Sequence, residues 1–177
     1  MKEVVIISGK GGTGKTSITA SFAVLGGEDI VVADCDVDAA DLHLLLDPDF
    51  SSPVDFYSGF IAKIDQHKCS QCGDCANICR FNAIPFKDGQ YVINEVACEG
   101  CGYCARVCPT QAIEMEEQNV GHWYISKTRL NNNLVHARLG IGAENSGKLV
   151  AKVKNEAKAL AEKNQKNMII VDGSPGV

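Results

Sequence analysis

The chain has 177 residues, of which 45% are hydrophobic and 22% charged, a composition typical of globular rather than disordered proteins. Lys and Arg number 17 against 22 Asp and Glu, and the resulting net charge of −5 argues against a protein that coats nucleic acid or anionic membranes. No apolar run approaches the roughly 20 residues of a membrane span, and the N-terminus shows no secretory pattern, so a cytoplasmic location is expected.

Three short apolar segments, residues 3–7, 29–33 and 168–171, predict buried parallel strands. Residues 15–25 predict a helix between the first two, which makes a right-handed βαβ unit. An amphipathic helix is predicted at 146–163. A hairpin is predicted from residues 119–128 and 133–139, with its turn at Asn131-Asn132.

A glycine-rich loop follows the first predicted strand and matches the phosphate-binding pattern G-x-x-x-x-G-K-[ST]. Its glycines let backbone N–H groups turn toward phosphate oxygens, and the following helix adds the positive end of its dipole. Lys15 would reach the β- and γ-phosphates, and the Thr16 hydroxyl would bind Mg²⁺. A glycine-rich turn without a ligand is the alternative. The candidate nucleotide-binding residues of this loop are Gly9, Lys10, Gly11, Gly12, Thr13, Gly14, Lys15, Thr16 and Ser17.

Nine cysteines without a secretory signal favour metal ligands over disulfides. Eight of them form two sets that repeat at an interval of 29 residues. The first set is Cys69, Cys72, Cys75 and Cys79, and the second is Cys98, Cys101, Cys104 and Cys108. Gly73 also recurs as Gly102, and Ala83-Ile84 recurs as Ala112-Ile113, so the segment is predicted to have two structurally equivalent halves.

The cysteine spacing is that of two-cluster bacterial ferredoxins, in which the fourth cysteine of each motif ligates the other cluster. Two [4Fe–4S] clusters are therefore expected, with crossed ligands. Cluster one would take Cys69, Cys72, Cys75 and Cys108, and cluster two would take Cys98, Cys101, Cys104 and Cys79. Zinc is the alternative, but it has no use for the third cysteine of each motif. Arg80 stands where the second motif has Pro109, and the ninth cysteine, Cys35, is interpreted as a small buried apolar residue.

The loop sequence Lys-Gly-Gly-Thr-Gly-Lys-Thr resembles the deviant Walker A motif of the MinD/Mrp/nitrogenase-iron-protein class of P-loop ATPases. The resemblance implies ATP as the nucleotide and an ATP-dependent homodimer in which Lys10 reaches the partner's nucleotide. A solvated loop lysine is the alternative for Lys10. In this class Lys10 and Lys15 would act in catalysis.

Two acidic segments extend this resemblance. Asp34-Cys35-Asp36 resembles switch I, which implies that Asp36 positions the attacking water and that Asp34 supports Mg²⁺ indirectly. Capping of the following helix is the alternative for both aspartates. The segment from Asp172 to Gly176 resembles the Walker B and switch II region. Asp172 would hold Mg²⁺ through a water, or serve only as a turn former, and Gly176 would approach the γ-phosphate.

The whole chain resembles the subgroup of these ATPases with an inserted ferredoxin domain. The expected fold is a P-loop doubly wound parallel sheet (residues 1–64 and 118–177) with an inserted α+β ferredoxin-like domain (65–117). The resemblance also implies that the chain stops just after switch II. Only three strands of the sheet, and weak ATP turnover by this chain alone, are therefore expected.

The sequence is consistent with three functions. The first is an ATP-gated redox protein that couples nucleotide state to electron transfer. The others are an iron–sulfur assembly or carrier ATPase, and an electron carrier whose P-loop only senses nucleotide. The expected partner is a redox protein or an iron–sulfur acceptor protein.

Overall fold

The computed structural model describes the chain except residues 39, 141–145 and 176–177. It divides into two compact units, Met1–Phe56 with Val120–Val177, and Tyr57–Asn119. Two long strands, β3 (Val54–Ile64) and β6 (Ile113–Lys127), carry the chain into the second unit and back.

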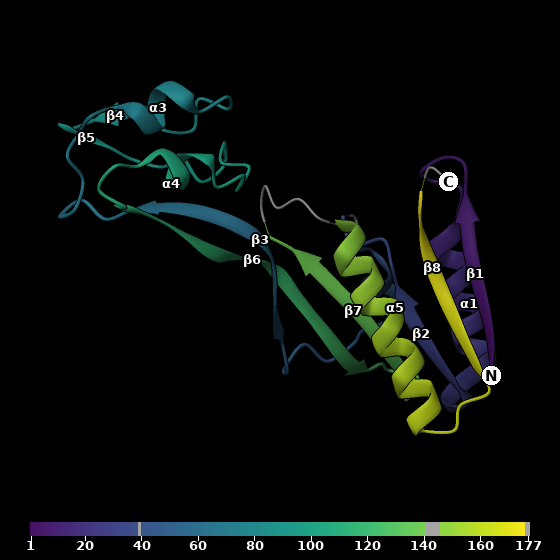
Figure 1. Cartoon of the computed structure of the whole chain (residues 1–177). Coiled ribbons are helices and arrows are strands. Elements are labelled where there is room, and N and C mark those ends of the chain that lie inside the picture. The colour runs from purple at the N-terminus through teal and green to yellow at the C-terminus, as the bar shows by residue number, and fades with distance from the viewer. Residues whose placement is uncertain (39, 141–145, 176–177) are drawn as a thin grey trace. The chain divides into compact units, whose positions relative to one another are not determined.

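The first unit is built on a mostly parallel sheet whose strands follow the order β1-β8-β2-β7-β6-β3 (Figure 1). The first four strands in this order are parallel, and β6 pairs antiparallel with β7. Their bounds are β1 (Lys2–Ser8), β8 (Met168–Pro175), β2 (Ile30–Asp34) and β7 (Asn133–Leu139). All five residues of β2 are buried, as expected for a strand covered on both faces.

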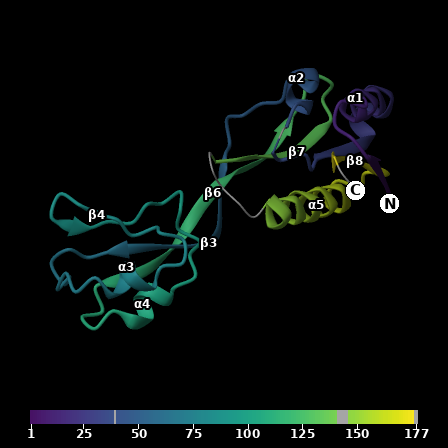
Figure 2. The ribbon, with the colours of Figure 1, turned by 90° about the horizontal axis from the view of Figure 1, so that it is seen from above.

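Helices cover the two faces of this sheet (Figure 2). On one face lies α5 (Ser146–Lys163), which buries Leu149, Val153, Ala157 and Ala161 completely against β2, β7 and β8. On the other face lie α1 (Lys15–Gly26) and α2 (Leu42–Leu46), packed on the alternate residues of the same strands. A 3₁₀ turn, η1 (Gly27–Asp29), joins α1 to β2. This three-layer arrangement leaves the carboxyl ends of the parallel strands open to a ligand.

Most of the predicted elements are confirmed, and two expectations about the sheet are wrong. The predicted helix at 146–163 is α5, and the hairpin predicted from residues 119–128 and 133–139 is formed by β6 and β7. The sheet has six strands instead of three, because β7 pairs with β2, which brings the hairpin of β6 and β7 into the sheet, and β3 joins the sheet beside β6. It is not wholly parallel, since the short turn after β6 permits only an antiparallel return.

The second unit contains two short helices, α3 (Asp74–Ile78) and α4 (Tyr103–Val107). Two-residue strands, β4 (Phe86–Lys87) and β5 (Gln90–Tyr91), form a hairpin between them. The small core of this unit includes Ala62, Cys75, Ile84 and Ile113. Cysteine side chains thus make up part of the core itself.

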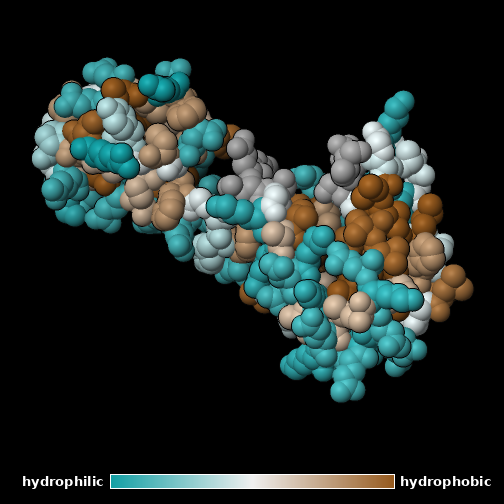
Figure 3. All heavy atoms as spheres, turned by 45° about the vertical axis from the view of Figure 1, so that its right-hand side comes forward, coloured by the Kyte–Doolittle hydropathy of each residue, from teal (hydrophilic) through white to brown (hydrophobic). Residues whose placement is uncertain are grey.

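Apolar side chains are exposed over β1 and α1 in the first unit (Figure 3). In β1 they include Val5 and Ile7, and in α1 they include Phe22 and Leu25, the last of which is 82% exposed. Strand β1 stands at the end of the strand order, so one of its edges has no neighbouring strand among the described residues. No helix in the described ranges has the length and apolarity needed to cross a membrane.

Candidate functional site

The 29-residue repeat in the sequence is also a repeat of backbone conformation. Helices α3 and α4 follow Gly73 and Gly102, whose φ angles of 83° and 72° lie in the left-handed region that glycine adopts without strain. Asn82 and Gln111 are a second matched pair, with φ angles of 51° and 53°. The two halves therefore present their cysteines on nearly the same backbone.

One cavity of about 470 Å³ lies in the second unit and is lined by the thiols of both motifs. Its cysteines are Cys98, Cys101, Cys104 and Cys79. The walls are mainly apolar, with Ile84 and Ile93 among them, and Arg80, Phe81 and Tyr103 also line the cavity. Three cysteines of the second motif are thus brought together with the last cysteine of the first.

The complementary four thiols line a second, much smaller cavity. They are Cys69, Cys72, Cys75 and Cys108. The difference in size has a local cause: Tyr91 lines the small cavity, whereas the position 29 residues earlier is Ala62, which lines the large one. A phenol ring fills space on one side that a methyl group leaves open on the other.

The surroundings of the thiols suit their role as thiolate ligands that hold a positively charged metal group. Burial raises the pKa of the Cys75 and Cys104 thiols, so these sulfurs are neutral without a metal and lose their protons when one binds. Backbone N–H groups of Ala83 and Ala112 donate to the sulfurs of Cys79 and Cys108, at 3.4 and 3.3 Å. Four sulfurs around one apolar cavity, with donors to the sulfur, fit an iron–sulfur cluster. Among the described residues no three or more His, Cys, Asp or Glu side chains are close enough to hold a single metal ion.

A third cavity, of about 410 Å³, opens at the glycine-rich loop of the first unit. The side chain of Lys15 is only 7% exposed there, and the left-handed φ angles of Gly12 and Gly14 turn the loop before α1 begins. The cavity is lined by Gly11, Gly12, Thr13, Gly14, Lys15, Thr16, Ser17, Asp36 and Asp41. Backbone N–H groups, a lysine and a helix N-terminus together make an anion-binding arrangement.

Two buried carboxylates lie at the carboxyl ends of the neighbouring strands. Asp34 of β2 and Asp172 of β8 are paired in register, and each is 1% exposed. The Thr19 hydroxyl donates to Asp172 Oδ1 at 3.1 Å, and the Asp36 N–H donates to Asp34 Oδ1 at 3.1 Å. Asp34 Oδ2 is buried without a hydrogen-bond partner within the described ranges. Burial, followed by the nearby Asp172 carboxylate, raises the pKa of Asp34 to about 7.

The remaining predicted residues lie outside this cavity or outside the described residues. Gly9 and Lys10 are exposed and do not line it. The Lys10 carbonyl oxygen accepts hydrogen bonds from the Ser8 and Thr13 hydroxyls, which hold the loop's shape. Gly176 falls outside the described residues.

Four residues near these sites carried no motif signal in the sequence. Asp41 lines the loop cavity, Thr19 binds Asp172, Tyr91 fills the small thiol cavity, and Thr110 contacts Cys108. Thr19 lies one helical turn after Lys15, so the predicted helix already placed the two residues on the same face. For Thr110, alignment of the two repeats would have shown a polar residue opposite Phe81.

Comparison with known proteins shows the class to which the second unit belongs. Residues 62–115 match the family described as 4Fe-4S dicluster domain. Thirty-two residues are 56% identical to Ferredoxin-1 of Rhodobacter capsulatus, over 18% of this chain and 49% of that protein. The chain therefore contains an iron–sulfur electron-carrier domain of the ferredoxin type, here called the dicluster domain.

A second relative extends along the whole chain. It is the uncharacterized protein MJ0578 of Methanocaldococcus jannaschii, 40% identical over 177 residues. The match covers 99% of this chain and 60% of the relative, so the chain spans less than two thirds of the length of that protein.

Proposed function

We propose that the protein binds ATP with Mg²⁺ in the first unit and couples the nucleotide state to electron transfer through two [4Fe–4S] clusters in the dicluster domain. In this proposal the first unit is a P-loop ATPase domain of the MinD/Mrp/nitrogenase-iron-protein class. ATP turnover is expected of the whole protein, because this chain spans 60% of the relative that it matches along its length.

The observation that carries the nucleotide proposal is the convergence of loop, lysine and carboxylates at one edge of the sheet. Lys15 is buried in the wall of a cavity that is large enough for a polyphosphate, and the N-terminus of α1 faces the same loop. Thr16 and Asp172 would hold Mg²⁺, which neutralises phosphate charge when it is bound. Asp36 lines the cavity and would orient the attacking water.

The cluster proposal uses the two sets of thiols that each line one cavity. Cys69, Cys72, Cys75 and Cys108 would hold cluster one, and Cys98, Cys101, Cys104 and Cys79 would hold cluster two. Each cluster supplies one-electron transfer when bound. The protein's part is to bury the sulfurs, donate N–H groups to them and exclude water from the apolar walls.

Coupling between the two activities follows from the order of the chain. After Asp36 the chain passes through α2 into β3, the strand that leads into the dicluster domain. A shift of the Asp36 segment with the γ-phosphate would therefore act on that strand. Lys10 would complete a partner's nucleotide site in an ATP-dependent homodimer, which is consistent with its exposure.

One observation favours a second function, the transfer of a cluster to an acceptor protein. The cavity of the cluster-two thiols is the larger of the two, and Cys101 in its wall is exposed. A ligand sulfur at the surface can be reached by an acceptor's thiol. An electron carrier that only senses nucleotide is the third possibility.

An anaerobic EPR redox titration with and without MgATP tests the proposal, with ATP binding measured separately by calorimetry. A shift in the potential or line shape of either cluster supports coupling. Binding of ATP without any spectral change contradicts coupling and favours the sensing function. Loss of one cluster to an added apo-ferredoxin, faster with MgATP, would favour cluster transfer.

A further inference from the structure

The two halves of the dicluster domain allow a matched comparison at positions 29 residues apart. The N–H of Ala112 donates to Cys108 Sγ at 3.3 Å, and the N–H of Ala83 donates to Cys79 Sγ at 3.4 Å. The backbone therefore treats the two crossing sulfurs alike. A difference between their surroundings must come from side chains.

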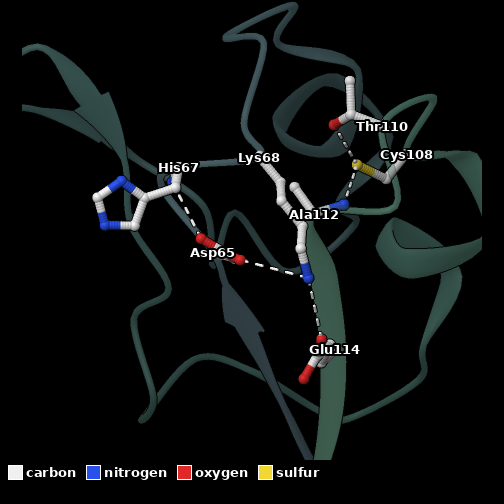
Figure 4. Close-up of polar contacts among 7 residues, drawn as sticks. All are labelled: Asp65, His67, Lys68, Cys108, Thr110, Ala112 and Glu114. Carbon is white, nitrogen blue, oxygen red and sulfur yellow. Dashed lines mark hydrogen bonds and ion pairs between the residues drawn. The ribbon is translucent and has the colours of Figure 1, made fainter.

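Such a difference stands two residues after each cysteine. Thr110 lines the cavity of the cluster-one thiols, and its Oγ1 lies 3.6 Å from Cys108 Sγ (Figure 4). The matched residue, Phe81, lines the cavity of the cluster-two thiols and has no hydroxyl. One sulfur thus has a side-chain hydrogen-bonding group that the other lacks.

Charged groups on the same side of the domain act less directly. Lys68 pairs with Asp65 at 3.3 Å and with Glu114 at 3.6 Å (Figure 4). All three side chains are at least 34% exposed, so water and salt screen them. Among the described residues, it is the Thr110 side chain that forms a hydrogen bond with Cys108 Sγ.

We propose that the Thr110 hydroxyl donates a hydrogen bond to the Cys108 thiolate and raises the reduction potential of cluster one. The inference rests on the proposed ligand set in which Cys108 joins Cys69, Cys72 and Cys75. A thiolate bound to iron has no proton to give, so the hydroxyl is the donor.

The direction of the effect follows from charge. Reduction is [4Fe–4S]²⁺ + e⁻ → [4Fe–4S]⁺, with the electron supplied by a reductant such as dithionite, and part of the added negative charge resides on the sulfur ligands. A hydrogen bond to a charged acceptor is strengthened when that charge grows, so the donor stabilises the reduced cluster more than the oxidised one.

The test is an anaerobic EPR redox titration of wild type, Thr110→Val and Thr110→Ser, with iron content measured on each and no nucleotide present. In Thr110→Val one cluster should show a three- to tenfold lower ratio of reduced to oxidised form at a given potential. The upper value corresponds to about 59 mV for a one-electron couple. Thr110→Ser should retain the wild-type midpoint potential. The midpoint potential of cluster two should be unchanged in both variants.

Phe81→Thr is the matched variant on the other half, where an added hydroxyl should raise the potential of cluster two. If Thr110→Val fails to bind iron, Phe81→Thr still tests whether a hydroxyl at this position raises the potential of a cluster. Unchanged midpoints in every variant that carries full iron would overturn the role of Thr110 alone. A wild-type protein that does not bind two [4Fe–4S] clusters would overturn the ligand sets, and the proposed electron transfer with them.

Discussion

The backbone N–H of Asp65 donates to the carbonyl oxygen of Ala112 at 2.7 Å, which ties the start of the first repeat to the end of the second. The N–H of Asn94 donates to the carbonyl oxygen of Ala83 at 2.8 Å, which ties the start of the second repeat to the end of the first. Each repeat therefore ends beside the beginning of the other. Since the last cysteine of each motif precedes Ala83 or Ala112 by four residues, it is carried to the other half's thiols.

Crossing of the ligands can be tested with the Cys79→Ser variant. Because Cys79 lines the cavity of Cys98, Cys101 and Cys104, this change should damage cluster two and leave cluster one in place. Iron analysis with EPR of the reduced protein measures the loss. Cys108→Ser is the matched control and should damage cluster one. Loss of the sequence-near cluster in both variants would contradict crossed ligation.

Close approach of two backbone segments predicts a sensitive glycine in the dicluster domain. Gly100 has a φ of 60°, and a Cβ there would collide with the carbonyl oxygen of Phe60. Gly89 has a φ of 80°, but a Cβ there would meet no atom within 4 Å. Both alanine variants carry a left-handed φ cost of roughly 1–2 kcal/mol, and Gly100→Ala adds the collision.

Thermal loss of the cluster absorbance compares the two glycine variants. Gly100→Ala should lose its absorbance at a clearly lower temperature than Gly89→Ala. Equal transition temperatures would mean that the Phe60 segment moves aside at no cost.

The dicluster domain could be predicted from sequence in unusual detail, because its information is local. The spacing of Cys98, Cys101 and Cys104 predicts how three thiols face one cavity, and the 29-residue repeat predicts a second such set. Burial of the matched pair Ala83 and Ala112, each 1% exposed, agrees with the equivalence of the two halves.

The six-stranded sheet was not predicted, because strand pairing is a long-range property. The sequence of β7 predicts one strand of a hairpin, and nothing in its own residues indicates that Val31 to Ala33 of β2 lie beside it. Strand β3 was missed because its residues alternate weakly between buried and exposed. The unequal cavities depend on Tyr91 and Ala62, whose correspondence only the repeat register reveals.

Lys15 is the residue with which to test nucleotide binding. Lys15→Ala should reduce ATP affinity by 100-fold or more, because it removes the cation from a cavity otherwise lined by glycines, hydroxyl residues and aspartates. Iron content should stay at the wild-type level, since Lys15 belongs to the unit without cluster ligands. Calorimetry and iron analysis on the same samples measure both.

Lys10→Ala is the matched control for that experiment, because Lys10 is exposed on the same loop and does not line the cavity. It should retain ATP binding by the single chain and lose ATP-dependent dimerisation, which light scattering measures. Equal loss of ATP affinity in both variants would contradict separate roles for the two lysines.

The buried His136 contributes a loss of stability to the first unit in mild acid, opposite in sign to the contribution of Asp34, whose raised pKa favours the folded state as the pH falls below 7. His136 is 2% exposed, and its Nε2 lies 2.9 Å from Ser126 Oγ. Burial first, and then the positive charges of Arg138 and His43, lower the pKa of His136 from 6.5 to about 4. Since the unfolded chain takes up this proton near pH 6.5 and the folded chain does not, acid favours unfolding as the pH falls from 6.5 toward 4.

The contribution of His136 alone lowers the free energy of unfolding by about 2 kcal/mol between pH 7 and pH 5. Urea unfolding followed by the fluorescence of Trp123, which lies in the same unit, measures it in the anaerobic full chain. His136→Gln should remove this contribution, so the change in its free energy of unfolding from pH 7 to pH 5 should be about 2 kcal/mol more favourable than that of wild type, because glutamine does not titrate. The exposed His67→Gln should leave it unchanged, and identical slopes for wild type and His136→Gln would show that His136 is not the group responsible.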